Sequence, residues 1–319
     1  MTARKAPDDA FVDRVSGMMF GAAIGDALGS AFEFVSNRKI EAALGGPCAR
    51  EYCDALAGSL MHPRPAGLPT DDTAMTLALV DALCDPGPSS VEPFHRRFVE
   101  ALARGAGPVA DLFWTGGPGG ACIAMLRVGL AGAGPFESLD PNAGGNGAAM
   151  RAHPCGIFSD REAVAEVAAL QARFSHPHRA AVASAQVVAL VVHEALITGR
   201  LAADCPPEVR DSTMRRAWDE MHRGSERGAR LPSQLVDVDM AGWNTVAAAH
   251  AIAALYEGDP EAGIGFAAAS GKDTDTVASI VGAMLGAVHG RRALPQRWID
   301  GLQGRDMIEQ RVAALLLLI

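Results

Sequence analysis

The sequence predicts an all-α protein, a compact orthogonal bundle of many helices. Long apolar stretches have the length and spacing of helices, no strand–helix alternation or fixed repeat occurs, and small residues supply much of the apolar bulk. Hydrophobic residues make up 49% of the 319 residues, whereas aromatic residues make up 5%, which favours closely packed helices with small contact residues. The length suits one large domain or two small ones, and we expect a single domain over residues 1–319.

The helical stretches follow one another along most of the chain. A Gly-interrupted helix is expected over residues 11–34, a second over 71–84 after a clear capping signal, and a third over 90–105. Residues 105–147 are rich in Gly and Pro and predict one short helix near 121–129, and the polar stretch 199–240 gives no clear prediction. Further helices are expected at 148–158, 161–175, 177–199, 243–258, 259–270 and 273–290, and the last turns of another at 312–319.

Charge and cysteine usage limit the possible partners and compartment. The formal net charge is −9 and no long basic run occurs, which argues against a nucleic-acid partner. The six cysteines are scattered without a CxxC pair, so we expect reduced thiols in a cytoplasmic protein, not disulfides or a zinc site. The first residues lack the apolar core of a secretion signal, and the apolar tail is too short to span a bilayer, so no membrane partner is expected.

The stretch "LPTDDTAM" places two neighbouring aspartates at the start of a predicted helix. Thr70 is a suitable N-cap, and acids in the first turn interact favourably with the helix dipole. Capping alone therefore explains Asp71 and Asp72 as well as a cation between them does.

A second acidic helix start, "GKDTDT", favours the cation. Asp273 and Asp275 lie two residues apart, so both carboxylates can face one point, and Thr276 adds a hydroxyl. If the two helix starts meet in space, four carboxylates repel one another unless cations bind. Oxygen ligands select Mg²⁺, Mn²⁺ or Ca²⁺ over zinc, and four acids suit two divalent ions.

Three further stretches contain candidate site residues. Asp26 and Glu33 are seven residues apart, so they share one face if the helix continues, although a solvent-facing pair or a Gly-broken turn explains them too.

"AGGNGAAMR" predicts a Gly-rich turn entering a helix, where the backbone N–H groups of Gly145, Asn146 and Gly147 suit a diphosphate and Arg151 adds charge. In "FSHPHR", Ser175 or His176 can cap a helix, or His176 or His178 can contact a ligand.

Together these stretches resemble the ADP-ribosylglycohydrolase family. The shared order is "GDALGSAFEF", "PTDDTAM", "GGNGAAMRAHP", "SHPH" and "DTDTVASIVGAMLGA", covering about residues 12–290. The resemblance implies an all-helical fold that binds two Mg²⁺ or Mn²⁺ ions. It also implies an enzyme that cleaves ADP-ribose from a modified side chain. It also implies roles for single residues: metal ligands Thr70, Asp71, Asp72, Asp273, Asp275 and Thr276; an acid near the scissile bond, Glu33, with Asp26 behind it; a diphosphate and ribose loop around Asn146; and a ligand contact from His176.

The expected activity is therefore a dimetal hydrolase acting on an ADP-ribosylated protein or a small ADP-ribose conjugate, with ADP-ribosyl-arginine as the first substrate to test. Glu33, Asp72 and Asp273 are the candidate catalytic acids. The family usually has Gly-Gly-Asp where this chain has Gly271-Lys272-Asp273, which keeps open a module that binds ADP-ribose or blocks a toxin without turnover. A metal phosphoesterase is the third hypothesis, and release of inorganic phosphate from ADP-ribose would distinguish it.

Overall fold

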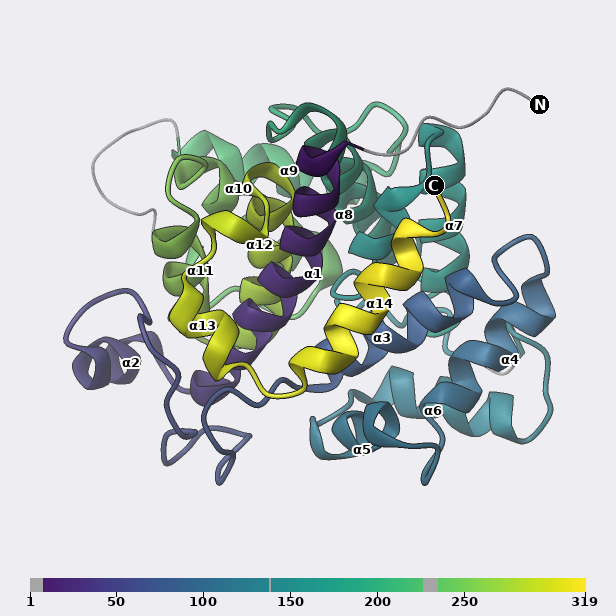
Figure 1. Ribbon diagram of the computed structural model, residues 1–319, viewed down its shortest axis with the longest axis horizontal. Coiled ribbons are helices and arrows are strands. Elements are labelled where there is room, and N and C mark those ends of the chain that lie inside the picture. The colour runs from purple at the N-terminus through teal and green to yellow at the C-terminus, as the bar shows by residue number, and fades with distance from the viewer. Residues whose placement is uncertain (1–7, 138, 226–234) are drawn as a thin grey trace.

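The computed structural model describes residues 8–137, 139–225 and 235–319, and within these residues the protein is helical without a strand. Two long helices, α1 (Asp9–Gly29) and α12 (Thr274–His289), pack against each other at the centre. The other helices surround this pair (Figure 1). They are α2 (Asn37–Leu44), α3 (Asp71–Cys84), α4 (Val91–Ala101), α5 (Pro108–Thr115), α6 (Gly120–Leu130), α7 (Arg161–Arg173), α8 (Arg179–Thr198), α9 (Ser212–Ser225), α10 (Gly242–Leu255), α11 (Pro260–Ala268), α13 (Gln296–Gly301) and α14 (Arg305–Leu316).

Glycines along α1 bring its backbone into direct contact with α12. A Cβ on Gly21 would lie 2.1 Å from the carbonyl oxygen of Gly282, and one on Gly25 would lie 2.0 Å from that of Ala278. Gly17 meets Gly286 in the same way, so the contact repeats every four residues along the antiparallel pair. The end of α1 therefore lies beside the start of α12, which holds the second acidic motif.

The start of α3 is fixed by side chains from two directions. Thr70 is the N-cap, and its Oγ1 accepts a hydrogen bond from Asp72 N at 3.2 Å. Asp26, fully buried on α1, accepts hydrogen bonds from Thr70 N and Thr73 N at 3.0 Å. A carboxylate of the central helix thus binds the unpaired N–H groups of a second helix, which docks the first acidic motif against α1.

Among the residues that the structure describes, two helical stretches are long and apolar enough to cross a bilayer by composition, but both belong to the core. The most apolar window in Asp9–Phe32 is 100% buried within the protein, and that in α8 is 83% buried. Burial of this kind is expected for core helices of a globular domain.

Most predicted helices are confirmed, and three differences have local causes. The helix predicted at 148–158 is wrong, because Pro154 has no N–H to donate to the carbonyl oxygen of Met150, and only a 3₁₀ turn, η2 (His153–Ile157), forms. Residues 105–147 contain α5 as well as α6, with Pro108 in the first turn of α5. α1 ends at Gly29 and continues as the 3₁₀ turn η1 (Ser30–Phe32), so the helix does not reach Glu33.

Candidate functional site

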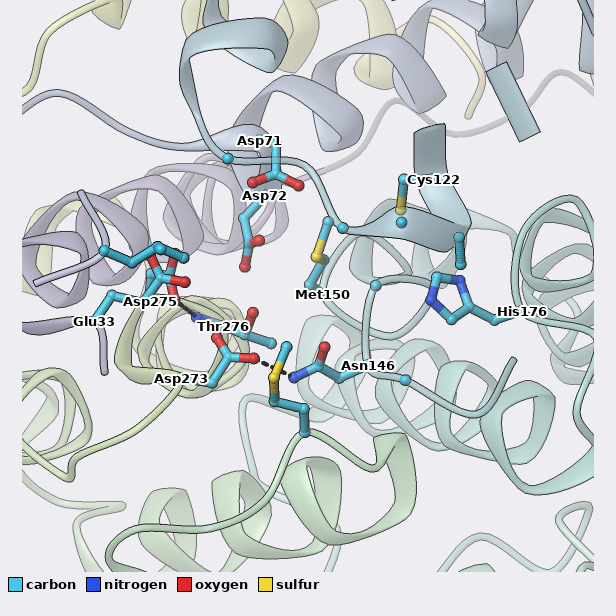
Figure 2. A pocket seen from close by; sticks show the side chains of 18 of the residues that line it. Glu33, Asp71, Asp72, Cys122, Asn146, Met150, His176, Asp273, Asp275 and Thr276 are labelled. Carbon is cyan, nitrogen blue, oxygen red and sulfur yellow. Dashed lines mark hydrogen bonds between the residues drawn. The ribbon is translucent and has the colours of Figure 1, made fainter. Parts of the chain in front are cut away.

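The two acidic helix starts meet in one cavity of about 370 Å³. Asp71 and Asp72 enter it from the start of α3, and Asp273, Asp275 and Thr276 from the start of α12 (Figure 2). Their motifs are about 200 residues apart in the sequence, and the contacts of α1 with α12 and α3 bring them together. The convergence expected from the sequence is therefore present.

Glu33 joins this cluster from the end of the η1 turn. It is 6% exposed, and one oxygen each of Glu33, Asp273 and Asp275 lie within 4.8 Å of one another. Asp72 faces the same space from the opposite helix (Figure 2). Oxygen atoms at this spacing are suitable ligands for a hard divalent cation.

The cluster is electrostatically costly without a counter-charge. Burial, followed by repulsion from Asp273 and Asp71, raises the pKa of Glu33 from 4.5 to about 8. Burial is also the largest cause of the raised pKa values of Asp71, Asp72 and Asp275, and neighbouring carboxylates add to it. Neighbouring carboxylates therefore oppose ionisation of Glu33, Asp71, Asp72 and Asp275, and a cation would remove that opposition.

Two buried oxygen atoms support a cation at this position. Glu33 Oε2 and Asp72 Oδ2 are buried and have no hydrogen-bond partner in the described part of the protein. An unpaired buried polar atom costs about 1–3 kcal/mol. Because both atoms belong to carboxylates in a cavity of oxygen donors, the residues present fit a divalent metal.

The Gly-rich loop forms the other side of the cavity. Gly145, Asn146 and Gly147 all line it, as does His176. Figure 2 shows Asn146 and His176 on this side. Asn146 Nδ2 donates to Asp273 Oδ2 at 2.8 Å, which joins the loop to the acidic cluster. The loop is tied to α10, because Gly242 N donates to the carbonyl oxygen of Gly144 at 3.0 Å.

Arg151 and Asp26 lie behind the cavity and do not line it. Arg151 is fully buried, and its Nη1 donates to the carbonyl oxygen of Gly147 at 2.8 Å. It therefore supports the loop from behind, and a direct contact with a ligand does not fit this placement. Because no α-helix starts at residue 148, the helix-dipole part of the predicted diphosphate site is also absent among the described residues.

Comparison with known proteins identifies the fold and its chemistry. A sequence profile described as ADP-ribosylglycohydrolase matches residues 7–319. The chain belongs to the ADP-ribosylglycohydrolase family. The family, the all-helical fold and the class of enzyme predicted from the sequence are thereby confirmed.

The ADP-ribosylglycohydrolase relatives extend over nearly the whole chain. The ADP-ribosylarginine hydrolase Tri1 of Pseudomonas putida (strain GB-1) is 27% identical over 94% of this chain and 76% of its own length. The ADP-ribosyl-[dinitrogen reductase] glycohydrolase of Rhodospirillum rubrum is also 27% identical, over 96% of each chain. A solved structure titled "ADP-ribosylglycohydrolase-related protein complex" superposes with a TM-score of 0.74 at 25% identity, covering 97% of this chain and 99% of that one.

Lys272, which departs from the usual family motif, has its side chain outside the cavity. The residue is exposed, it does not line the cavity, and its φ is +54°. Left-handed backbone favours glycine, which gives a physical reason for glycine at this position in the family motif. The lysine charge therefore lies outside the acidic cluster.

An apolar rim at the mouth of the cavity was not predicted. Phe34, Leu60 and Met240 line the cavity and are 44%, 62% and 46% exposed. Phe34 has a left-handed φ of +57°, and its N–H donates to the carbonyl oxygen of Lys272 at 2.6 Å. The only sequence signal for Phe34 was its position directly after Glu33.

The histidine motif is divided between two roles. His178, not Ser175 or His176, is the N-cap of α8, and its Nδ1 accepts from Ala180 N at 3.3 Å. The predicted caps at Ser175 and His176 are wrong. His176 instead lies against the Gly-rich loop, where a Cβ on Gly147 would be 2.8 Å from its Cε1.

Proposed function

We propose that this protein hydrolyses the bond between C1″ of ADP-ribose and a modified side chain, with ADP-ribosyl-arginine on a protein as the preferred substrate. The observation that supports this most directly is the convergence of two acidic helix starts and Glu33 on a cavity whose opposite side is the Gly-rich loop. The names of the Pseudomonas and Rhodospirillum relatives favour arginine and a protein acceptor.

The acidic cluster would hold two divalent cations, Mg²⁺ or Mn²⁺. Their ligands would be Thr70, Asp71, Asp72, Asp273, Asp275 and Thr276; among these, Thr70 is buried as the cap of α3 and the others line the cavity. Bound there, the cations would offset the carboxylate charge, orient ribose hydroxyls and acidify a water molecule. The unpaired carboxylate oxygens described above are the structural support for this site.

The protein's own residues supply proton transfer and positioning. Glu33 lines the cavity, and its Oε2 has no hydrogen-bond partner among the described residues. Its protonated carboxyl would give a proton to the departing nitrogen as the C1″–N bond breaks. A water oxygen bonds to C1″, the proton of that water returns to Glu33, and the diphosphate stays intact. Asn146 holds Asp273 in place, and the Gly-rich loop binds the diphosphate.

Incubation with proteins ADP-ribosylated on arginine or on serine tests the proposal. We expect free ADP-ribose from the arginine substrate, loss of release in EDTA, and recovery when Mg²⁺ or Mn²⁺ is restored. Asp273→Ala should abolish release without unfolding the protein. Asp306→Ala is the matched control, because Asp306 is an exposed acid in the first turn of α14.

Three outcomes would contradict the proposal. Release that EDTA does not change would reject the role of divalent cations, and wild-type turnover by Asp273→Ala would reject the assigned site. Binding of ADP-ribose without any turnover would favour the non-catalytic binding module. The exposed position of Lys272 removes the main sequence argument for that module.

A further inference from the structure

We propose that Arg151 and Ser175 form a hydrogen-bond relay that holds His176 as the Nε2–H tautomer, so that the ring donates a hydrogen bond to a diphosphate oxygen in the cavity. The ligand half of this inference rests on the proposed function. The relay itself rests on the hydrogen bonds of three buried residues and can be tested without any ligand.

The relay starts at a group that can only donate. A guanidinium has five N–H donors and no acceptor. Arg151 Nη2 donates to Ser175 Oγ at 2.8 Å, and its Nε donates to Gln171 Oε1 at 2.7 Å. Arg151 is 0% exposed, so these donors have no competing solvent.

Ser175 accepts from Arg151 and therefore donates to the histidine. Its Oγ lies 2.8 Å from His176 Nδ1, and Ser175 is 2% exposed. Because Oγ already accepts from Arg151, its own proton is free to donate to Nδ1. In the opposite arrangement, Nδ1–H would donate to Oγ, and the serine proton would have no acceptor among the described residues.

The remaining ring nitrogen faces the cavity. A neutral imidazole whose Nδ1 accepts must have its proton on Nε2. Nε2 is 3.2 Å from the position of a Cβ on Gly147 and 3.4 Å from one on Gly145, and no protein acceptor reaches it in the described part of the chain. His176 also lines the cavity, so this N–H is available to a ligand.

The position of this donor selects the chemistry of its ligand. The acidic cluster lies on one side of the cavity, and His176 lies with the Gly-rich loop on the other (Figure 2). Burial, followed by the charge of Arg151, lowers the pKa of His176 to about 3, so the ring is neutral at physiological pH. A neutral donor beside glycine N–H groups and away from the carboxylates suits an anionic oxygen acceptor.

The tautomer can be measured directly by ¹⁵N NMR of the histidine ring in the wild-type protein and in Ser175→Ala. We expect protonated Nε2 and unprotonated Nδ1 at His176 in the wild type, and a shift towards Nδ1–H in Ser175→Ala. Protonated Nδ1 in the wild type, or an unchanged pattern in the variant, would overturn the relay. Far-UV circular dichroism and thermal unfolding confirm that the variant is folded.

Calorimetric binding of free ADP-ribose tests the ligand half with a double-mutant cycle. Ser175→Ala should weaken binding about tenfold or more, because a donor facing an anion becomes an acceptor. In a His176→Gln background the same change should have little effect, since a glutamine amide donates without a tautomer choice. Equal losses in both backgrounds would show a purely structural role for Ser175 and overturn the proposal.

These two measurements separate this inference from the proposed function. A wild-type protein that binds no ADP-ribose would overturn the proposed function and the ligand half of the inference. The ring spectrum would still decide whether the relay exists.

Discussion

Replacing Gly25 by alanine tests the direct contact between α1 and α12. The new Cβ would lie 2.0 Å from the carbonyl oxygen of Ala278 and 2.4 Å from its carbonyl carbon. Real Cβ atoms do not approach so closely, and the atoms it meets are backbone, so no side-chain rotation relieves the overlap. The two helices must therefore separate by about 1 Å or more.

The expected loss of stability is the difference between two effects. Overpacking a close contact costs about 1–3 kcal/mol, and the rigid backbone on both sides places this site at the upper end. Alanine in a helix interior gains about 1 kcal/mol over glycine. We therefore expect the free energy of unfolding to fall by about 2 kcal/mol, measured by urea denaturation.

The functional loss should depend on where along the helix the overlap lies. Gly25 precedes Asp26 directly, whereas Gly17 is two turns further from the site and makes an equivalent overlap, 2.2 Å from the carbonyl oxygen of Gly286. The two variants should lose similar stability. Gly25→Ala should bind Mn²⁺ more weakly than Gly17→Ala, because displacement of about 1 Å at a site can cost about 100-fold in function.

Two results would refute this reasoning. A Gly25→Ala protein as stable as the wild type would mean that the helices are not in backbone contact. Equal Mn²⁺ affinities in the two alanine variants, measured by calorimetry, would mean that the end of α1 does not position the acidic cluster.

Three other measurements address the charge, the backbone and the rim of the site. Because the pKa of Glu33 is about 8 when folded against an ordinary 4.5, the folded protein binds more protons than the unfolded one between these pH values. The metal-free protein should therefore lose up to about 5 kcal/mol of stability as the pH rises through this window, and saturating Mn²⁺ should abolish the loss. Thermal unfolding across pH 4.5–8 with EDTA or Mn²⁺ measures this loss. A flat metal-free profile would count against the buried cluster. Lys272→Gly should relieve left-handed strain and raise stability by about 0.5–1 kcal/mol with unchanged turnover, and a less stable variant in urea denaturation would contradict this. Phe34→Ala should raise KM for an ADP-ribosylated protein several-fold while leaving the affinity for free ADP-ribose nearly unchanged, and equal effects on both would place the rim on the nucleotide side.

The acidic residues were predictable because their signals are local. The Thr-Asp-Asp and Asp-Thr-Asp motifs contain their own helix starts, and α3 begins at Asp71 as expected. Because carboxylates that meet repel one another unless a cation binds, the two motifs together indicated a metal site. The contact that brings them together has a sequence signal as well, glycines spaced four apart, but that spacing alone does not name the partner helix.

The supporting residues depended on tertiary contacts and could not be predicted in the same way. "GNGAAMRAHP" contains helix formers, so the sequence predicted a helix, but Pro154 has no N–H to continue α-helical hydrogen bonding, and residues 147–151 form a turn instead. An arginine after a Gly-rich loop suggested a ligand contact, whereas its four donated hydrogen bonds to oxygen all go to protein groups. Backbone conformation at Phe34 and Lys272 depends on a hydrogen bond between segments about 240 residues apart.

The pairing of the first and twelfth helices has a consequence during translation. During synthesis, α1 leaves the ribosome long before α12, because about 250 residues lie between the end of α1 and α12. Until then, the glycine-lined face of α1 cannot be buried against α12. A polypeptide that ends before α12 should consequently be inactive, because it lacks Asp275 and Thr276, and prone to aggregation, because α1 keeps its main contact face exposed.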